Sequence, residues 1–168
     1  PVTVWGQFGG WLGGGAPSSA AVFLTPDGSL NVEVGSSDIS GVNTSFAMIV
    51  AEIFNTPLNK ISVKLSNTAA SPYASMSAGS KTLRTVGLAV HDAAIDARSQ
   101  MFKVVAEKLE CSPDDLESVD GVIRVKGSPD KSMTFGTLGT MSTGYGSPVP
   151  VIFGRGSVGS PTMAPGFA

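Results

Sequence analysis

The stretch that decides the fold is SMSAGSKTLRTVGLAVHDAAIDARSQMFKVVAEKL, at residues 75–109. From about residue 80, apolar side chains recur at steps of three and four residues, which places them on one face of an α-helix. This apolar stripe consists of Leu83, Val86, Val90, Ala94, Ala97, Met101, Val104 and Val105. The outer face carries charged side chains, namely Lys81, Arg84, Asp92, Asp96, Arg98, Lys103 and Glu107. The pattern predicts an amphipathic helix of roughly eight turns over residues 80–109.

Upstream of this helix the sequence predicts a β-hairpin, a second and shorter helix, and a further strand. In the hairpin, two apolar runs flank Pro26-Asp27-Gly28, a sequence that is typical of a tight turn. The shorter helix has apolar side chains at helical spacing, is capped by Asn43 or Thr44, and ends before Pro57. The expected ranges are 20–24 and 30–34 for the hairpin strands, 43–56 for the helix and 61–65 for the strand.

Shorter elements are predicted downstream of the long helix. Ser112 followed by Pro113 begins a short turn, and Asp120-Gly121 is typical of a tight turn between two strands. Thr134 is placed to cap a short helix, and beyond Gly139 no periodicity predicts another element. Because strands and helices mix without strict alternation, the fold class is α+β, with a mixed sheet of short strands and hairpins packed on one long and one or two shorter helices.

Charge is concentrated in the middle of the chain. The 168 residues include 11 lysines and arginines and 13 acidic residues, yet residues 1–26 carry no charged side chain and residues 132–168 carry only Arg155. An independent domain normally carries charge around its whole surface. Either the two ends are low-complexity tails, or they pack against protein outside this chain, which their aromatic and branched side chains favour.

We therefore expect one partial domain over residues 1–168, with its core at about residues 20–138. The charge-poor ends, residues 1–19 and 139–168, are expected to pack on missing parts of a longer protein or on a partner. In isolation these ends would expose more apolar surface than a monomer usually tolerates. We then expect them to pair with other copies in a homo-oligomer.

Composition argues against several classes of protein. A formal net charge of -2 is unsuited to a nucleic-acid groove, which needs clustered cations. One cysteine, Cys111, cannot form an internal disulfide or hold a structural zinc ion by itself. No apolar run approaches the ~20 residues that span a bilayer. We expect no nucleic acid, no membrane and no metal held by side chains, and a cytoplasmic location.

No residue is assigned a catalytic or metal-binding role. The single histidine, His91, lies on the predicted long helix beside Asp92, where a surface position is the favoured interpretation. A hydrolase that uses His91 is the least favoured alternative. Cys111, at the end of the same helix, is interpreted as a small, half-buried thiol rather than a nucleophile.

Two loops that each follow a strand and enter a helix are the best candidates for a binding site. The first covers residues 35–41 and the second residues 75–82, and both are rich in glycine and serine. A helix N-terminus presents unpaired N–H groups and a partial positive charge. Two such ends side by side would suit an anionic, hydrogen-bonding cofactor. Helix capping by the loop side chains is the alternative.

A family resemblance is carried by residues 35–90, GSSDISGVNTSFAMIVAEIFNTPLNKISVKLSNTAASPYASMSAGSKTLRTVGLAV, and continues through CSPDDLESVDGVIRV at residues 111–125. These runs resemble the molybdopterin-binding large subunits of the xanthine dehydrogenase, aldehyde oxidase and carbon monoxide dehydrogenase family. The most specific part is the loop SMSAGSKT followed by the long helix. The family usually has Gly-Gln-Gly in the first loop, where this chain has Ser40-Gly41 in a loop that is one residue shorter.

The resemblance implies a fragment of a molybdenum hydroxylase large subunit. Such a subunit binds molybdopterin, or its cytosine dinucleotide form, for oxidative hydroxylation of aldehydes, N-heterocycles or carbon monoxide. The implied partners are the rest of the large subunit and the iron–sulfur and flavin subunits or domains that carry electrons away. The residues implied to contact the cofactor are Asp38, Ile39, Ser40 and Gly41 in the first loop and Ser77, Ala78, Gly79, Ser80 and Thr82 in the second.

The resemblance also sets an expectation for activity. The family's catalytic glutamate is expected beyond residue 168 and its Gly-Phe-Gly loop before residue 1. Loss of a general base commonly lowers a rate by about 10²–10⁴-fold, so we expect this chain alone to have no turnover and to lack the cofactor. The alternative function is a non-catalytic α+β scaffold or interaction module derived from the family, which the shortened first loop favours.

Overall fold

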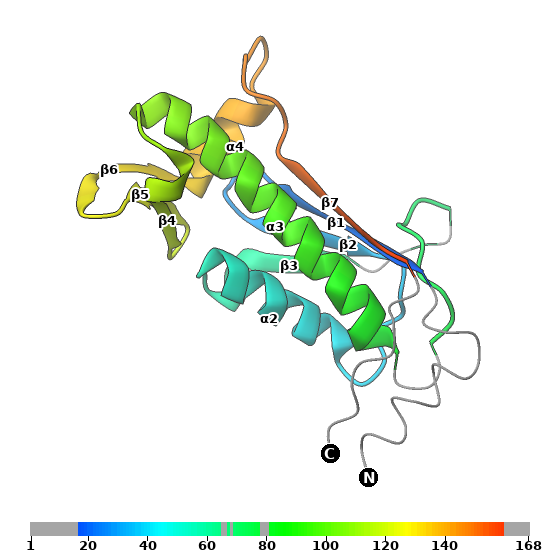
Figure 1. The fold of residues 1–168 in the computed structure, drawn as a ribbon. Coiled ribbons are helices and arrows are strands. Elements are labelled where there is room, and N and C mark those ends of the chain that lie inside the picture. Colours follow the sequence, from blue (N-terminus) through cyan, green and yellow to red (C-terminus); the bar gives the residue numbers. More distant parts are fainter. Residues whose placement is uncertain (1–16, 65–66, 68, 78–80, 160–168) are drawn as a thin grey trace.

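The computed structural model describes residues 17–64, 67, 69–77 and 81–159 of the chain. Figure 1 shows the long helix α3 lying across a four-stranded sheet, with α2 beside it and a smaller sheet near the far end of α3. This arrangement confirms the predicted α+β fold class. The described elements are β1 (Ser18–Leu24), β2 (Leu30–Val34), α2 (Val42–Phe54), β3 (Ile61–Lys64), α3 (Thr82–Leu109), β4 (Leu116–Val119), β5 (Val122–Val125), β6 (Ser128–Thr134), α4 (Phe135–Thr143) and β7 (Phe153–Val158), with 3₁₀ turns at Leu58–Lys60 and Pro113–Asp115.

The larger sheet has the strand order β3-β2-β1-β7. The predicted hairpin is confirmed, because β1 and β2 pair antiparallel with Val22 opposite Val32, around a turn in which Gly28 has a φ of 85°. β3 pairs parallel to β2, and β7 pairs antiparallel to β1, with Gly154 opposite Val22. Alternate residues of β1 and β2 face the helices, so Val22, Leu30 and Val32 are fully buried.

The sequence does not predict strand β7, because the residues that this strand turns toward the core are glycines. A Cβ built on Gly154 would lie 2.1 Å from a carbonyl oxygen of α3, and one built on Gly156 would lie 1.9 Å from another. Glycine is needed here for two backbones to approach closely. Ile152, just before the strand, is fully buried. The core therefore extends beyond the expected limit at residue 138, and part of the expected charge-poor end, residues 139–168, packs within this chain.

The buried face of α3 differs in part from the predicted stripe. Leu83 is 48% exposed, whereas Lys81, expected on the outer face, is only 9% exposed. The reason is that β1 and β7 lie against a row of mostly small residues at four-residue spacing. Thr85 belongs to that row. Because Leu83 precedes Thr85 by two residues, its side chain is rotated by about 200° around the helix axis and points to the opposite side of α3. The row comprises Lys81, Thr85, Ala89, Ala93, Ala97, Met101 and Val105.

The start of α2 also differs from the prediction. The helix begins at Val42 after Gly41, which has a φ of 73°, so neither Asn43 nor Thr44 is its N-cap residue. Gly41 holds that position because the chain enters the helix through the left-handed region, which favours glycine. The end of α2 at Phe54 agrees with the predicted stop before Pro57.

The predicted downstream elements are confirmed in the smaller sheet and in α4. The Asp120-Gly121 turn joins β4 to β5, and both of its residues have positive φ. Thr134 Oγ1 accepts a hydrogen bond from the Thr137 N–H at 3.0 Å and so caps α4. The rings of Phe54 and Phe135 pack edge to face with centroids 5.8 Å apart, which joins this part to the main core.

Candidate functional site

Helices α2 and α3 run in the same direction, so their N-terminal ends lie at one edge of the molecule. In the first quarter of α3, a Cβ built on Gly87 would lie 3.3 Å from the side chain of Ile49, in the middle of α2. Farther along both helices, Arg98 Nη1 donates a hydrogen bond to the Ile53 carbonyl oxygen at 3.1 Å. The contacts thus advance along both helices together, and Figure 1 shows both helix starts at the same end of the sheet.

The segment that leads into the second loop is attached to the sheet near the point where the first loop begins. The Ser19 N–H donates a hydrogen bond to the Tyr73 carbonyl oxygen at 2.7 Å, and Ala74 forms a β-bridge with Ser18. Gly35, the first residue of the first loop, lies so close to the segment before the second loop that an added Cβ would be 2.0 Å from the Pro72 carbonyl oxygen. The start of the first loop is therefore adjacent to the segment that leads into the second loop, and the proximity of the two loops themselves stays a prediction.

The first loop is exposed at all four positions that the resemblance implies, Asp38, Ile39, Ser40 and Gly41. Ser40 and Gly41 have φ values of 57° and 73°, which turn the chain sharply into α2. Asp38 Oδ1 accepts a hydrogen bond from the Asn43 N–H at 3.1 Å. The capping alternative therefore holds for Asp38, whose carboxylate satisfies one N–H group in the first turn of α2.

The second loop contributes hydroxyl groups at the start of α3. The hydroxyl oxygens of Ser77 and Thr82 are 2.8 Å apart and share a hydrogen bond in an exposed position. Each hydroxyl can donate one hydrogen bond and accept others, so both retain capacity to bind a ligand. The other expected contact residues of this loop, Ala78, Gly79 and Ser80, lie outside the described residues.

Lys81 belongs to this edge as well, although the sequence pattern places it on the solvent face. Its Nζ donates a hydrogen bond to Ser75 Oγ at 2.7 Å. Burial lowers the pKa of the Lys81 ammonium group. The signal that could have found it is the spacing of Lys81, Thr85 and Ala89, which continues the buried four-residue row to the start of α3.

Polar groups without partners test whether the site fits an anionic cofactor. The two N-cap residues, Gly41 of α2 and Lys81 of α3, make no side-chain capping hydrogen bond. Among the residues that the structure describes, Ser36 Oγ in the first loop and Asn43 Oδ1 in the first turn of α2 are buried without a hydrogen-bond partner, as is Thr56 Oγ1 beyond the C-terminal end of α2. Buried polar atoms are normally hydrogen-bonded, and helix N-termini attract anions. The residues present therefore fit an anionic ligand that is rich in hydrogen-bonding groups.

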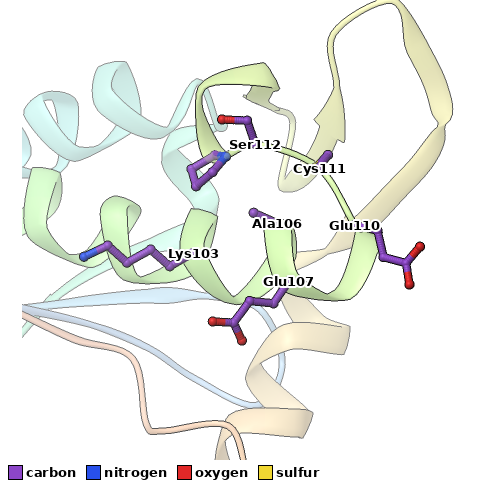
Figure 2. Close-up of a pocket in the computed structure, with 7 residues that line it drawn as sticks. Lys103, Ala106, Glu107, Glu110, Cys111 and Ser112 are labelled. Atoms are coloured by element: carbon purple, nitrogen blue, oxygen red, sulfur yellow. The ribbon is translucent and has the colours of Figure 1, made fainter.

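His91 and Cys111 lie away from these loops. His91 is exposed on α3 with its Nδ1 3.1 Å from Asp92 Oδ1, which confirms the surface interpretation. Cys111 follows the C-terminal end of α3, and Figure 2 shows the shallow pocket that it lines together with Glu107 and Glu110. Because α3 has 28 residues, its two ends are about 40 Å apart. Cys111 therefore cannot contribute to the site at the helix starts.

Among the described residues, no helix is both long enough and apolar enough to cross a membrane. No group of three or more His, Cys, Asp or Glu side chains in these ranges could hold a metal ion.

Comparison with known sequences gives one family match and several relatives. Residues 2–154 match the family model described as a molybdopterin cofactor-binding domain. The chain is 35% identical over 133 residues to the carbon monoxide dehydrogenase large chain of Afipia carboxidovorans. The matched stretch covers 79% of this chain and 16% of that protein. It is 28% identical over 117 residues to the nicotine 6-hydroxylase large subunit of Paenarthrobacter nicotinovorans. This match covers 69% of this chain and 14% of that protein. The chain thus spans less than a fifth of either relative.

Comparison with solved structures gives the same fold. A CO dehydrogenase structure from Oligotropha carboxidovorans matches with a TM-score of 0.74 at 27% identity, over 89% of this chain and 19% of that chain. Quinoline 2-oxidoreductase from Pseudomonas putida 86 matches with a TM-score of 0.72 at 22% identity, over 87% of this chain and 19% of that chain. The second likeness shows the fold alone.

Proposed function

The chain belongs to the molybdopterin cofactor-binding domain family, and from this premise we propose that its two loops bind molybdopterin or the cytosine dinucleotide form of that cofactor. The observation that carries the proposal is the pair of helix starts at one edge, with Ser36 Oγ and Asn43 Oδ1 buried and unpartnered in the described structure. A serine hydroxyl can donate to a phosphate oxygen of a pterin cofactor, and an asparagine Oδ1 can accept from a pterin N–H group. When bound, the cofactor supplies the redox-active molybdenum centre.

The proposed role of this chain's residues is to hold and orient the cofactor. Because one of the Ser77 and Thr82 hydroxyls donates to the other, the pair keeps one proton to donate to a ligand at the start of α3, and both oxygens can still accept. Gly41 leaves open space, since a Cβ built on it would meet nothing within 4 Å among the described atoms, and a ligand can approach the backbone there. The serine hydroxyl of Ser40 reaches less far than a glutamine amide would. The full proposed contact set is Asp38, Ile39, Ser40, Gly41, Ser77, Ala78, Gly79, Ser80 and Thr82.

The whole protein that carries this domain is proposed to be a molybdenum hydroxylase large subunit, acting on aldehydes, N-heterocycles or carbon monoxide. Support comes from relatives named as a carbon monoxide dehydrogenase large chain and a nicotine 6-hydroxylase large subunit. The proposed partners are the rest of the large subunit and iron–sulfur and flavin subunits, in the cytoplasm. Because the chain spans only 16% of the first of these relatives, we propose that it has no turnover by itself.

The second candidate function is a non-catalytic scaffold that has lost the cofactor. Two features favour it. The first loop has Ser40-Gly41 where the family usually has Gly-Gln-Gly. The Asp38 carboxylate, which caps α2, also places negative charge where the cofactor's anionic groups would bind.

Cofactor content distinguishes the two functions. The protein that carries this chain should be purified from molybdenum-replete cells and analysed for molybdenum by mass spectrometry and for pterin by fluorescence after denaturation. Binding predicts both in near-equal amounts with the protein, and a marked loss of both in the Ser77→Ala, Thr82→Val double variant. A Ser62→Ala change on exposed β3 is the matched control and should retain both. Wild-type protein without either component would support the scaffold.

A further inference from the structure

A pocket of about 420 Å³ lies at the C-terminal end of α2, on residues that the proposed cofactor site does not use. Its lining includes the carboxylates of Glu52 and Asp120 and the apolar side chains of Met48 and Leu58. Because α2 has 13 residues, this end of the helix is about 20 Å from the start that adjoins the first loop. The pocket is therefore separate from the site at the helix starts.

The turn between β4 and β5 is held against the end of α2, which brings Asp120 to the pocket. The Asp120 N–H donates a hydrogen bond to the Asn55 carbonyl oxygen at 2.8 Å. The buried Ser118 hydroxyl donates to the carbonyl oxygen of Phe54, the last residue of α2. Carboxylates from two distant parts of the sequence, Glu52 and Asp120, thus line one pocket.

Neither carboxylate has a cationic partner. Glu52 and Asp120 are exposed, and among the described residues neither side chain forms an ion pair or a hydrogen bond. None of the described residues that line the pocket is basic. The C-terminal end of a helix also carries a partial negative charge. The pocket therefore favours a cationic group.

A second observation, independent of the charges, points to a ligand in the same pocket. Thr56 also lines it, is 8% exposed, and has an Oγ1 that is buried without a hydrogen-bond partner in the described structure. This oxygen faces the β4–β5 turn, because a Cβ built on Gly121 would meet only Thr56 Oγ1, at 3.9 Å, apart from its own chain neighbours and within the described residues. A buried hydroxyl without a partner is destabilising. An N–H donor in the pocket would supply the missing hydrogen bond.

We propose that this pocket binds the guanidinium group of an arginine side chain on a partner polypeptide. A guanidinium group has five N–H donors in one plane, so it can donate to both carboxylates and to Thr56 Oγ1. It is weakly hydrated, and its alkyl stem can lie on apolar surface. Met48 and Leu58, which are 56% and 48% exposed, provide that surface. The inference goes beyond the proposed function and does not rest on it.

The shape of the pocket favours a polypeptide over a free molecule as the source of the guanidinium group. The pocket is open on one side. A free ligand would therefore keep much of its surface in water, whereas small-molecule sites usually bury most of the ligand. An arginine side chain is held in addition by the contacts of the residues that flank it.

The test is an NMR titration of the full 168-residue chain, labelled with ¹³C at its methionine methyl groups, with the peptide acetyl-Gly-Leu-Arg-Leu-Gly-amide. The Met48 resonance should shift, whereas that of the fully buried Met101 should not. The same peptide with citrulline, which has nearly the shape of arginine without its charge, should bind about tenfold more weakly. Agmatine, a free alkylguanidinium, should also bind more weakly than the arginine peptide. An unmoved Met48 resonance, or equal affinity for the arginine and citrulline peptides, would overturn the site, and tighter binding of agmatine would overturn the polypeptide as its source.

A pair of carboxylate variants tests the charges. Glu52→Gln combined with Asp120→Asn should weaken binding of the arginine peptide by about tenfold, because two partly exposed ion pairs are lost. Asparagine tolerates the left-handed φ of 49° at position 120, so the turn should be kept. Glu107→Gln combined with Asp130→Asn is the matched control, since it removes the same charge at exposed positions outside the pocket. Unchanged affinity of the pocket variant, or an equal loss in the control, would overturn the proposal.

Thr56→Val tests the unpartnered hydroxyl. The change should lower affinity for the arginine peptide by about threefold to tenfold, because one hydrogen-bond acceptor is lost. The midpoint of urea denaturation should stay the same or rise, since a buried hydroxyl without a partner is removed. Unchanged affinity, or a lowered midpoint, would overturn the role of Thr56. The titrations of the wild-type chain need no variant, so they decide on the pocket even if a variant does not fold.

Discussion

The middle of α3 and its start make opposite kinds of contact. In the middle, Gly154 and Gly156 of β7 bring one backbone directly against another, with no polar side chain between them. At the start, Lys81 Nζ donates a hydrogen bond to Ser75 Oγ, and the first loop contains the buried, unpartnered hydroxyl of Ser36. A close-packed backbone contact contributes stability, whereas unpaired polar groups lower stability unless a ligand binds them. Substitutions in the two regions should therefore affect stability and ligand binding separately.

The largest expected effect is in the middle region. Gly156→Ala adds a Cβ that would lie 1.9 Å from the Ala89 carbonyl oxygen and 2.7 Å from the Ala93 N atom. Because both neighbours are helix backbone, β7 must move away from α3. We expect a loss of about 3 kcal/mol in the free energy of unfolding, measured by urea denaturation.

Gly159→Ala is the matched control for this prediction. Gly159 lies just beyond β7, and a Cβ built on it would meet nothing within 4 Å among the described atoms. The change should leave the free energy of unfolding within about 0.5 kcal/mol of the wild type. Similar stability of both variants would show that β7 does not depend on backbone contact with α3.

The next largest effect is expected at the boundary between the two regions. The Ser18 hydroxyl donates to Thr85 Oγ1 at 3.1 Å, and both side chains are almost fully buried. Thr85→Val leaves the Ser18 hydroxyl without its partner and should lower the free energy of unfolding by about 2 kcal/mol. The double variant Ser18→Ala, Thr85→Val should recover part of that loss, because no buried hydroxyl then remains unpaired. A double variant less stable than Thr85→Val would contradict this explanation.

The same division explains which parts of the fold could be predicted from the sequence. The hairpin and α3 have local signals, the Pro26-Asp27-Gly28 turn and helical periodicity. Strand β7 has none, since the need for Gly154 and Gly156 arises only when α3 lies against them. A local pattern contains no information about that distant contact.

The candidate site was predictable to a similar extent. Loop composition and the family resemblance indicate both loops, and the structure places the start of the first loop against the segment just before the second one. Lys81 was assigned to the solvent face because charged residues are usually exposed. Its burial accompanies a hydrogen bond to Ser75, a contact that helical periodicity does not contain. The capping role of Asp38 likewise depends on a left-handed turn at Ser40 and Gly41 that composition does not determine.

A smaller effect on stability, with a separate effect on binding, is expected in the second loop. Ser77→Ala removes an exposed hydrogen bond to Thr82, so the free energy of unfolding should change by less than about 0.5 kcal/mol. Affinity for pyrophosphate should fall by about threefold to tenfold, because one neutral hydrogen-bond donor is lost. Ser99→Ala, at an exposed position on α3, is the control and should change neither quantity. A destabilised Ser77→Ala variant with unchanged binding would assign the loop to the fold instead.

The smallest effect concerns Asp27, whose charge, unlike that of Lys81, is satisfied within its own turn. Hydrogen bonds from the hydroxyls of Thr25 and Ser29 and from the Ser29 N–H lower the pKa of Asp27 from 3.8 to about 2. Because the folded pKa lies below the unfolded one, the stabilisation is complete above about pH 4 and is lost as the pH falls through about 2. Asp27→Asn should therefore be less stable than the wild type near neutral pH and should approach it in urea denaturation at about pH 2. Asp130→Asn, an exposed position on β6, is the control. A constant difference between Asp27→Asn and the wild type across this range would mean that the turn does not stabilise the carboxylate, and the contrast with the unsatisfied charge of Lys81 would then no longer hold.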